Sequence, residues 1–322
     1  MRPLPTVNNP ASFKDLKICV LQPDYSTSEV DYQYYDPKRD LSSIMPEAHI
    51  DHVFLNKLTT YQQLKELKEK NYDIYINLCE GYLEWTVPSI DVIMSLDLLG
   101  LPYTGPSTNL YDPPKTIMKY LAFCEDVKTP AHIHIESEAD IAQLPGNLQF
   151  PLFVKPAKAG DSLGVDNASK ANNTSDLVTK VKSILAEFGA ALVEEYIDGR
   201  EFTVLVSANA DGKTCTSFVP VEYIFPEGFS FKTYALKTSE LHPTANIPVT
   251  DPSLANRLKN IAEQVFMSFN GVGYGRMDFR MNDKGELFFL EINFTCSVFY
   301  AQGYEGSADY ILLHDGAGQR GF

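Results

Sequence analysis

The sequence predicts an α/β protein in which an N-terminal parallel-sheet domain is followed by two lobes of mixed helix and strand. Two patterns lead to this fold class. Short apolar runs alternate with helix-length segments over the first 110 residues, and longer, antiparallel-looking strands begin near residue 192. The 322 residues are 44% apolar and include 19 Phe and 18 Tyr, which is enough material for a large packed core.

The first domain is expected to span residues 1–110. Residues 17–22, 49–55 and 73–78 each read as a buried strand, and a helix is predicted over 60–70. Strands that alternate with crossover helices form parallel sheets, so this region is an α/β unit. The Gly- and Pro-containing segment 105–114 then marks a boundary between domains.

Two lobes are expected after that boundary, a central one over residues 111–191 and a C-terminal one over 192–322. The central lobe contains predicted helices over 115–125 and 175–188 and a strand over 150–155. The main helix of the C-terminal lobe begins with Asp251 as N-cap and Pro252 in its first turn, and it ends at Asn270-Gly271. Its apolar residues share one face, which predicts a core helix rather than a site.

Composition excludes several classes of function. The net charge of -15 argues against a general binder of nucleic acids or anionic membranes, because both need clustered Lys and Arg. The five cysteines are scattered without a CxxC pair, which is typical of reduced thiols. We find no signal segment and no apolar run of membrane-spanning length, so a cytoplasmic location is expected.

The most informative stretch is a predicted hairpin whose strands cover residues 274–281 and 286–293. If the turn over residues 282–285 closes it regularly, Met281 faces Glu286 and Arg276 faces Glu291. Alternation along each strand then puts Arg276, Asp278, Glu291 and Asn293 on one face. The opposite, buried face takes the apolar neighbours, which are Met277, Phe279, Phe288, Leu290 and Ile292. Hard oxygen ligands of this kind suit Mg²⁺, although a charged strand face with an Arg276–Glu291 pair is the alternative.

Two further strings carry polar residues at strand ends. Lys155 precedes a loop with Ser162, Gly160 and Gly164, where backbone N–H groups and an ammonium group can approach phosphate. The loop is no Walker A motif, and an ordinary surface turn is an equally good interpretation. The string VEEYIDGREFTV, residues 193–204, has consecutive carboxylates that can accept hydrogen bonds from a nucleotide or form a solvated connector.

In combination, the strings VKPAKAGDSLGV, VEEYIDGREFTV and GYGRMDFRMNDKGELFFLEIN resemble the ATP-grasp superfamily, specifically its D-alanine–D-alanine ligase branch. The resemblance covers about residues 100–312 and is fainter over 17–100. It implies a two-lobed ATP-grasp fold that holds ATP between its lobes, with Mg²⁺ as the metal, Mn²⁺ as an alternative and two ions as an option.

The resemblance also implies a role for each matching residue. The ATP-binding residues would be Lys115, Lys155, Glu194, Glu195, Tyr196, Ile197, Glu201 and Lys237. The metal ligands would be Asp278, Glu291 and Asn293, a set that the hairpin pattern reaches independently. The catalytic residues would be Arg276, Ser162 and Lys237, and the substrate-binding residues Glu29, Gly306 and Ser307.

The implied reaction joins a carboxylate substrate to an amine, such as an amino acid, through an acylphosphate, with release of ADP and phosphate. Small molecules are therefore the expected partners, and a homodimer is compatible with the resemblance. The family's substrate-binding strings are altered, however: its usual His-Gly string is replaced by residues 77–82 with Glu80, and its Ser-Pro-Gly turn by residues 294–297. An unusual substrate is thus expected, for example in secondary metabolism such as mycosporine-like amino acid biosynthesis. An authentic D-alanine–D-alanine ligase and a non-catalytic nucleotide-binding protein are the alternatives.

Overall fold

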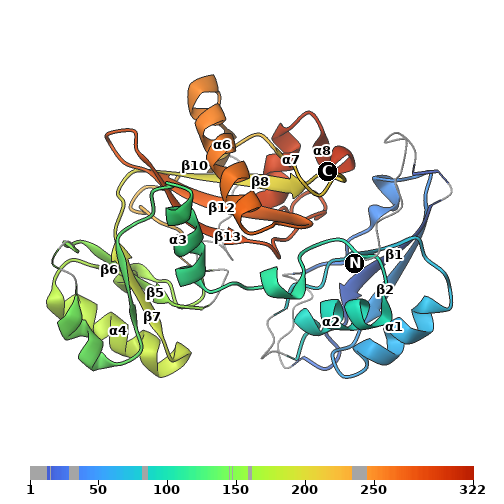
Figure 1. Cartoon of the computed structure of the whole chain (residues 1–322), viewed down its shortest axis with the longest axis horizontal. Coiled ribbons are helices and arrows are strands. Elements are labelled where there is room, and N and C mark those ends of the chain that lie inside the picture. Colours follow the sequence, from blue (N-terminus) through green and yellow to red (C-terminus); the bar gives the residue numbers. More distant parts are fainter. Residues whose placement is uncertain are drawn as a thin grey trace. The chain divides into compact units, whose positions relative to one another are not determined.

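The structure is a computed structural model that describes residues 13–14, 16–28, 36–81, 86–144, 146, 148–158, 162–233 and 245–322. The chain forms two compact units. The first contains residues up to Tyr111 together with Val272–Tyr274 and Phe294–Phe322, and the second contains Asp112–Gly271 and Gly275–Asn293. Figure 1 labels their helices and strands.

The first unit contains a parallel three-stranded sheet, as predicted. Its strands are β1 (Lys17–Pro23), β2 (His49–Leu55) and β3 (Ile74–Asn77), in the order β2-β1-β3. Helices α1 (Thr60–Lys68) and α2 (Ile90–Leu99) pack against each other and share a buried apolar cluster with these strands (Figure 1). The short C-terminal helices α7 (Ser307–His314) and α8 (Gly318–Gly321) also belong to this unit.

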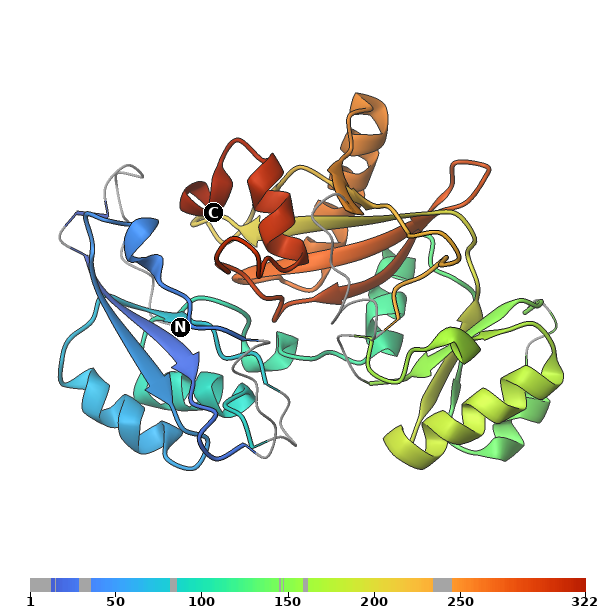
Figure 2. The ribbon, with the colours of Figure 1, turned by 180° about the vertical axis from the view of Figure 1, so that it is seen from behind.

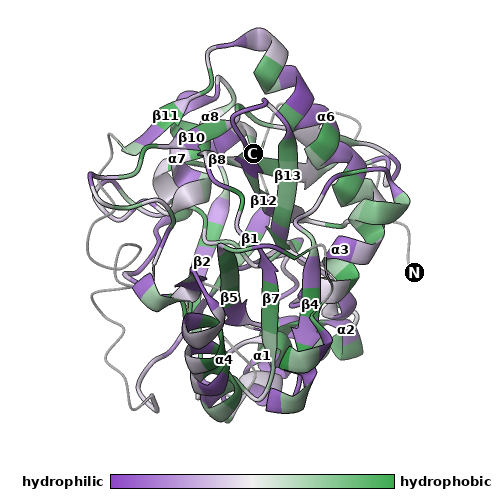
Figure 3. Ribbon diagram, turned by 90° about the vertical axis from the view of Figure 1, so that its left-hand side faces the viewer, coloured by the Kyte–Doolittle hydropathy of each residue, from purple (hydrophilic) through white to green (hydrophobic). Residues whose placement is uncertain are grey.

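The second unit begins with helix α3 (Lys115–Cys124) and an antiparallel four-stranded sheet. The strands are β4 (His132–Ile135), β5 (Leu152–Pro156), β6 (Lys170–Ala171) and β7 (Ala191–Glu195), in the order β4-β7-β5-β6. Helix α4 (Thr174–Phe188), with Asn173 as N-cap, packs on one face of the sheet. Figure 3 shows the hydrophobic residues of β5 and β7 that form this core.

A six-stranded sheet completes the second unit, seen from behind in Figure 2. It contains β8 (Arg200–Ala208), β9 (Cys215–Ser217), β10 (Val221–Tyr223), β11 (Asn246–Pro248), β12 (Tyr274–Met281) and β13 (Leu287–Asn293). Helix α6 (Pro252–Ser268) packs against β8 and β9, and the Asp251 side chain accepts a hydrogen bond from the Ser253 N–H as its N-cap. That helix is core, as its periodicity predicts.

The β12–β13 hairpin forms where predicted, but its predicted register is wrong. Asp278 lies opposite Glu291 and Arg276 opposite Asn293, whereas Met281 lies opposite Leu287. The connection is one residue longer than expected, and a bulge after Asp278 adds a further residue at Leu290. All four polar residues still share one face. The assignment of Phe288 and Leu290 to the buried face is wrong, because both are only partly buried and Leu290 lines the pocket described below.

The chain passes from one sheet of the second unit to the other between Glu195, the last residue of β7, and Arg200, the first residue of β8. The sequence-based boundary at residues 191 and 192 lies inside β7, and the division into three domains stays a prediction. Among the described residues, no helix is long and apolar enough to cross a membrane. All five cysteines are free thiols.

Candidate functional site

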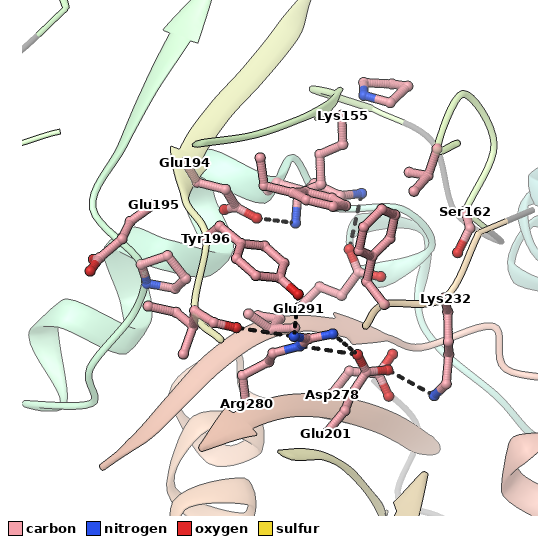
Figure 4. Close-up of a pocket in the computed structure, with 18 of the residues that line it drawn as sticks. Lys155, Ser162, Glu194, Glu195, Tyr196, Glu201, Lys232, Asp278, Arg280 and Glu291 are labelled. Carbon is pink, nitrogen blue, oxygen red and sulfur yellow. Dashed lines mark hydrogen bonds and ion pairs between the residues drawn. The ribbon is translucent and has the colours of Figure 1, made fainter. Parts of the chain in front are cut away.

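A pocket lined by polar and apolar side chains opens in the second unit (Figure 4). It draws side chains from both sheets of that unit and from helix α3. Most of the residues that the sequence nominates for nucleotide and metal lie around it, namely Lys115, Lys155, Ser162, Glu194, Glu195, Tyr196, Ile197, Glu201, Asp278 and Glu291. The fold therefore brings together residues that are widely separated in the sequence.

Strand alternation explains how β5 and β7 supply their polar residues. In the antiparallel pairing, Phe153 lies opposite Glu194 and Lys155 opposite Leu192, so these residues share one face. Their apolar neighbours, including Val154, point to the other face and pack against α4. One face of the sheet is thus core, and the other presents Phe153, Lys155 and Glu194 to the pocket.

Glu194 is the centre of a buried charge cluster. Its Oε1 atom lies 2.6 Å from Lys155 Nζ, and its Oε2 atom lies 2.7 Å from Lys119 Nζ. Burial alone would raise the pKa of Glu194, but the two ammonium groups outweigh that effect and lower it to about 2. The pKa of Lys155 is raised in turn, because Glu194 and Glu291 overcome the effect of burial. The Glu194 carboxylate is therefore engaged with lysines, which differs from the adenine contact that the resemblance implies.

An aromatic wall lies next to this cluster. The Phe153 and Tyr196 rings stack with centroids 6.1 Å apart, and Phe231 meets both of them edge-on. Ile197 and Glu195 also line the pocket. An apolar aromatic surface of this kind can pack against the face of a heteroaromatic ring such as adenine.

Glu201 lies below the aromatic wall and is held by two cations. Its Oε1 atom is 3.0 Å from Lys232 Nζ, and Arg280 Nη2 donates to Oε2 at 2.9 Å (Figure 4). Arg280 also donates to the Ile197 carbonyl at 3.0 Å and stacks on the Tyr196 ring. Burial would raise the pKa of Glu201, but Lys232 and Arg280 lower it to about 2. Arg280 thereby fixes the position of the segment that connects the two sheets.

The acidic end of the hairpin borders the same pocket. Asp278 and Glu291 face each other across β12 and β13, and Lys115 Nζ lies 3.3 Å from Glu291 Oε2. Arg276 Nη2 donates to Asp278 Oδ2 at 3.2 Å, while Asn293 lies opposite Arg276 in the ladder.

These residues fit a hard divalent cation. Within the described part of the chain no cluster of three or more His, Cys, Asp or Glu side chains suits a metal ion, so the candidate set is two carboxylates and an amide. The Asp278 Oδ1 atom is buried and has no hydrogen-bond partner among the described residues. A buried carboxylate oxygen in that condition is costly unless a cation or ligand joins it. Two carboxylates and an amide leave further positions for phosphate oxygens and water, as Mg²⁺ prefers.

The loop after β5 contributes Ser162 to the pocket with a left-handed backbone at φ 57°. Gly164 follows at φ 71°, and a Cβ there would lie 2.8 Å from both Pro156 and Phe188. Glycine is therefore required for the loop to turn back over α4.

Six further predicted residues are not among the described residues that line the pocket, and Arg276 and Asn293 at the end of the hairpin are two of them. Glu29 and Lys237 fall outside the described residues, as does Gly160. Gly306 and Ser307 belong to the first unit, at the start of α7, where the Gly306 N–H donates to Asp309 at 3.2 Å. Their role in substrate binding stays a prediction.

The first unit holds a second buried polar cluster, at the carboxyl end of β3. Arg39 lies 3.0 Å from Glu80 and 3.2 Å from Asp36, and the Ser297 hydroxyl donates to Glu80. Tyr300 donates to Asp36, and its ring lies under the Arg39 guanidinium. Burial raises the pKa of Glu80 to about 7, although Arg39 opposes the change. Glu80 and Ser297 are at two of the positions where the sequence departs from the family pattern.

Sequence reasoning missed three charged residues of the second unit, Lys119, Lys232 and Arg280. Lys119 is four residues after Lys115 on one face of α3, and Arg280 is two residues after Asp278 on one face of β12. The same periodicity that nominated their neighbours could have found both. Lys232 carries no such signal, because no regular element places it.

Acid is expected to destabilise the protein through Glu194 and Glu201. Both pKa values fall from 4.5 to about 2 on folding, so their stabilisation is complete above about pH 4.5 and is lost as the pH falls towards 2. Each contributes on the order of 3 kcal/mol. Urea denaturation at pH 7, 4.5 and 3 measures this, and a Glu194→Gln variant should be less stable at pH 7 with a shallower loss below pH 4.5. If the free energy of unfolding fell with pH as steeply in the variant as in wild type, the lowered pKa of Glu194 would be contradicted.

Solved structures of known proteins share this fold. Among solved structures, the D-Ala:D-Ser ligase VanG from Enterococcus faecalis superposes with a TM-score of 0.67 at 17% identity, over 95% of this chain and 97% of that one. A D-alanine–D-alanine ligase from Bacillus anthracis complexed with ATP gives 0.65 at 18% identity, over 95% and 94%. The fold is that of the ATP-grasp ligases, as predicted.

Sequence comparison identifies the family within the ATP-grasp ligases. The family model described as D-ala D-ala ligase C-terminus matches residues 120–299, more than half of the chain, and the chain belongs to the D-alanine–D-alanine ligase family. A D-alanine–D-alanine ligase from Streptococcus pneumoniae (strain Hungary19A-6) is 30% identical over 231 residues, which cover 69% of this chain and 62% of that protein. One from Bordetella avium (strain 197N) is 25% identical over 203 residues, 62% of each. The chain thus spans less than two thirds of the length of the curated relatives that it matches.

Proposed function

We propose that the protein is an ATP- and Mg²⁺-dependent ligase that joins a carboxylate substrate to an amine, in particular an amino acid, with release of ADP and phosphate. One observation carries the proposal. Lys115, Lys155, Asp278 and Glu291 line the same pocket as the aromatic wall of Phe153, Tyr196 and Phe231. Cations and hard oxygen ligands beside an apolar aromatic surface suit the phosphates and the base of one ATP molecule.

The proposed chemistry has two steps. An oxygen of the substrate carboxylate attacks the γ-phosphorus of ATP, the bond between that phosphorus and the bridging β-phosphate oxygen breaks, and ADP leaves. The amine then attacks the carbonyl carbon of the acylphosphate, loses a proton, and phosphate departs as the C–N bond forms. Mg²⁺, held by Asp278, Glu291 and Asn293, would neutralise charge on the phosphates.

The chain's own residues bind and orient the reactants. Lys115 and Lys155 would contact phosphate, Arg276 would offset negative charge that develops at the reacting group, and Ser162 would donate to phosphate from its loop. Glu195, Tyr196 and Ile197 would hold the adenine, and Glu201, fixed by Arg280, would accept from the ribose hydroxyls. Gly306, Ser307 and the residues outside the described ranges, Glu29 and Lys237, would complete the substrate and phosphate contacts.

The first substrate is proposed to differ from D-alanine. Glu80 replaces the histidine of the family's His-Gly string, and its carboxylate is tied to Arg39 and Ser297. A carboxyl group held by a buried guanidinium offers different recognition from an imidazole, because it has no positively charged form that could pair with a substrate carboxylate.

ADP release tests the proposal directly. The purified protein with ATP and Mg²⁺ is screened against amino acids in pairwise combination with small carboxylic acids, with D-alanine alone as a separate sample. We expect ADP and phosphate in equal amounts, dependent on both substrates and absent with EDTA. Strong turnover with D-alanine alone would favour the authentic D-alanine–D-alanine ligase. ATP binding without turnover in any mixture would favour the non-catalytic alternative.

A further inference from the structure

The proposed chemistry uses Lys115 and Lys155 but not Lys119, the second lysine that pairs with Glu194. Lys119 lies one turn after Lys115 on α3, and its residue is 1% exposed. Its Nζ atom is 2.7 Å from Glu194 Oε2, whereas Lys155 Nζ is 2.6 Å from Glu194 Oε1. One carboxylate therefore holds two ammonium groups, one on each oxygen.

The two lysines differ in their access to the pocket. Lys155 and Glu194 line it, but Lys119 does not, so Glu194 stands between Lys119 and a bound molecule. Burial also lowers the pKa of Lys119, and Glu194 opposes that change. A buried ion pair is weak evidence for stability, because an apolar side chain of similar size often serves a core as well. The position of Lys119 thus calls for a reason other than packing.

We propose that Lys119 is a positioning residue that keeps Lys155 available for phosphate by sharing the charge of Glu194. Two ammonium groups and one carboxylate leave one net positive charge in the cluster. With Lys155 as the only partner of Glu194, the pair would be neutral and its ammonium group would be occupied. Lys119 draws part of the carboxylate charge to the side away from the pocket, so the excess positive charge remains at Lys155. This inference rests on the proposed binding of ATP.

Binding of ATP and of adenosine separates this role from a structural one, because adenosine lacks the phosphates. We expect Lys119→Met to weaken ATP binding about tenfold, the effect of losing one nearby unit charge, and to change adenosine binding less than twofold. Lys119→Arg should restore ATP binding because it returns the charge. Calorimetric titration of each ligand gives both dissociation constants.

A matched control is available on α4. Lys180 is also buried, at 5% exposure, and its Nζ atom lies 2.9 Å from Asp166, but it does not line the pocket. Lys180→Met should therefore leave the ratio of ATP affinity to adenosine affinity unchanged. If Lys119→Met does not fold, the double variant Lys119→Met/Glu194→Gln provides the test, since it again carries one net positive charge. Its affinity ratio should lie within threefold of wild type.

The outcomes are distinct. Wild-type protein that binds neither ATP nor adenosine would overturn the proposed function, and this inference with it. Wild-type binding of ATP that is matched by Lys119→Met, or an equal loss for ATP and adenosine, would overturn the inference alone. So would a tenfold loss of the affinity ratio in the double variant.

Discussion

Replacing Asp278 with asparagine is expected to lower ADP formation by about three orders of magnitude. The change keeps the size of the side chain but removes the negative charge from the buried Oδ1 atom, which has no hydrogen-bond partner among the described residues. If that atom binds Mg²⁺ against the phosphates, the lost charge stabilisation is worth several kilocalories per mole in the transition state. A coupled assay of ADP release at saturating substrates measures the effect.

A second measurement separates metal binding from a damaged fold. Mg²⁺ should tighten ATP binding to wild type and should do so much less in Asp278→Asn, as read by thermal stabilisation with ATP in the presence and absence of the metal. Asp283, an exposed carboxylate in the turn of the same hairpin, is the matched control, and Asp283→Asn should behave as wild type. Wild-type turnover in Asp278→Asn would remove the metal assignment.

Elements with a strong period were predictable from the sequence. Residues 49–55 form β2 with the predicted bounds, and the helix after Asp251 and Pro252 starts where its capping residues indicate. The shared face of Asp278 and Glu291 was also predictable, because alternation depends only on local strand geometry. Strand alternation alone therefore predicted the polar face of the hairpin correctly.

The register of that hairpin was not predictable by the same rules. It depends on a bulge beside Leu290, and the Phe289 N–H next to that bulge donates to the carbonyl of Lys128 at 2.8 Å. That contact comes from a distant segment, so no local pattern encodes it. The same holds for Glu194, whose partners Lys119 and Lys155 come from α3 and β5, far earlier in the chain. Tertiary contacts decide which of several available hydrogen-bond donors a carboxylate pairs with.

Gly199→Ala is expected to destabilise the second unit by more than about 3 kcal/mol, the largest effect that we predict for a small substitution. Gly199 has φ 135°, a conformation that residues with a Cβ rarely adopt. A Cβ at this position would lie 2.1 Å from the carbonyl oxygen of Met281 on β12. Because the obstacle is backbone in a sheet, the segment that connects β7 and β8 must move.

Gly212→Ala separates the steric clash from the cost of a positive φ alone. Gly212 has φ 63°, and a Cβ there meets no atom within 4 Å, so we expect a loss of only about 1 kcal/mol. Urea denaturation of both variants gives the two values. Movement of the Gly199 segment should also displace Glu201, two residues later, so nucleotide binding should weaken in Gly199→Ala but not in Gly212→Ala. Equal stability losses in the two variants would mean that the Met281 carbonyl can move aside, and the close approach of β12 to this segment would then have no structural consequence.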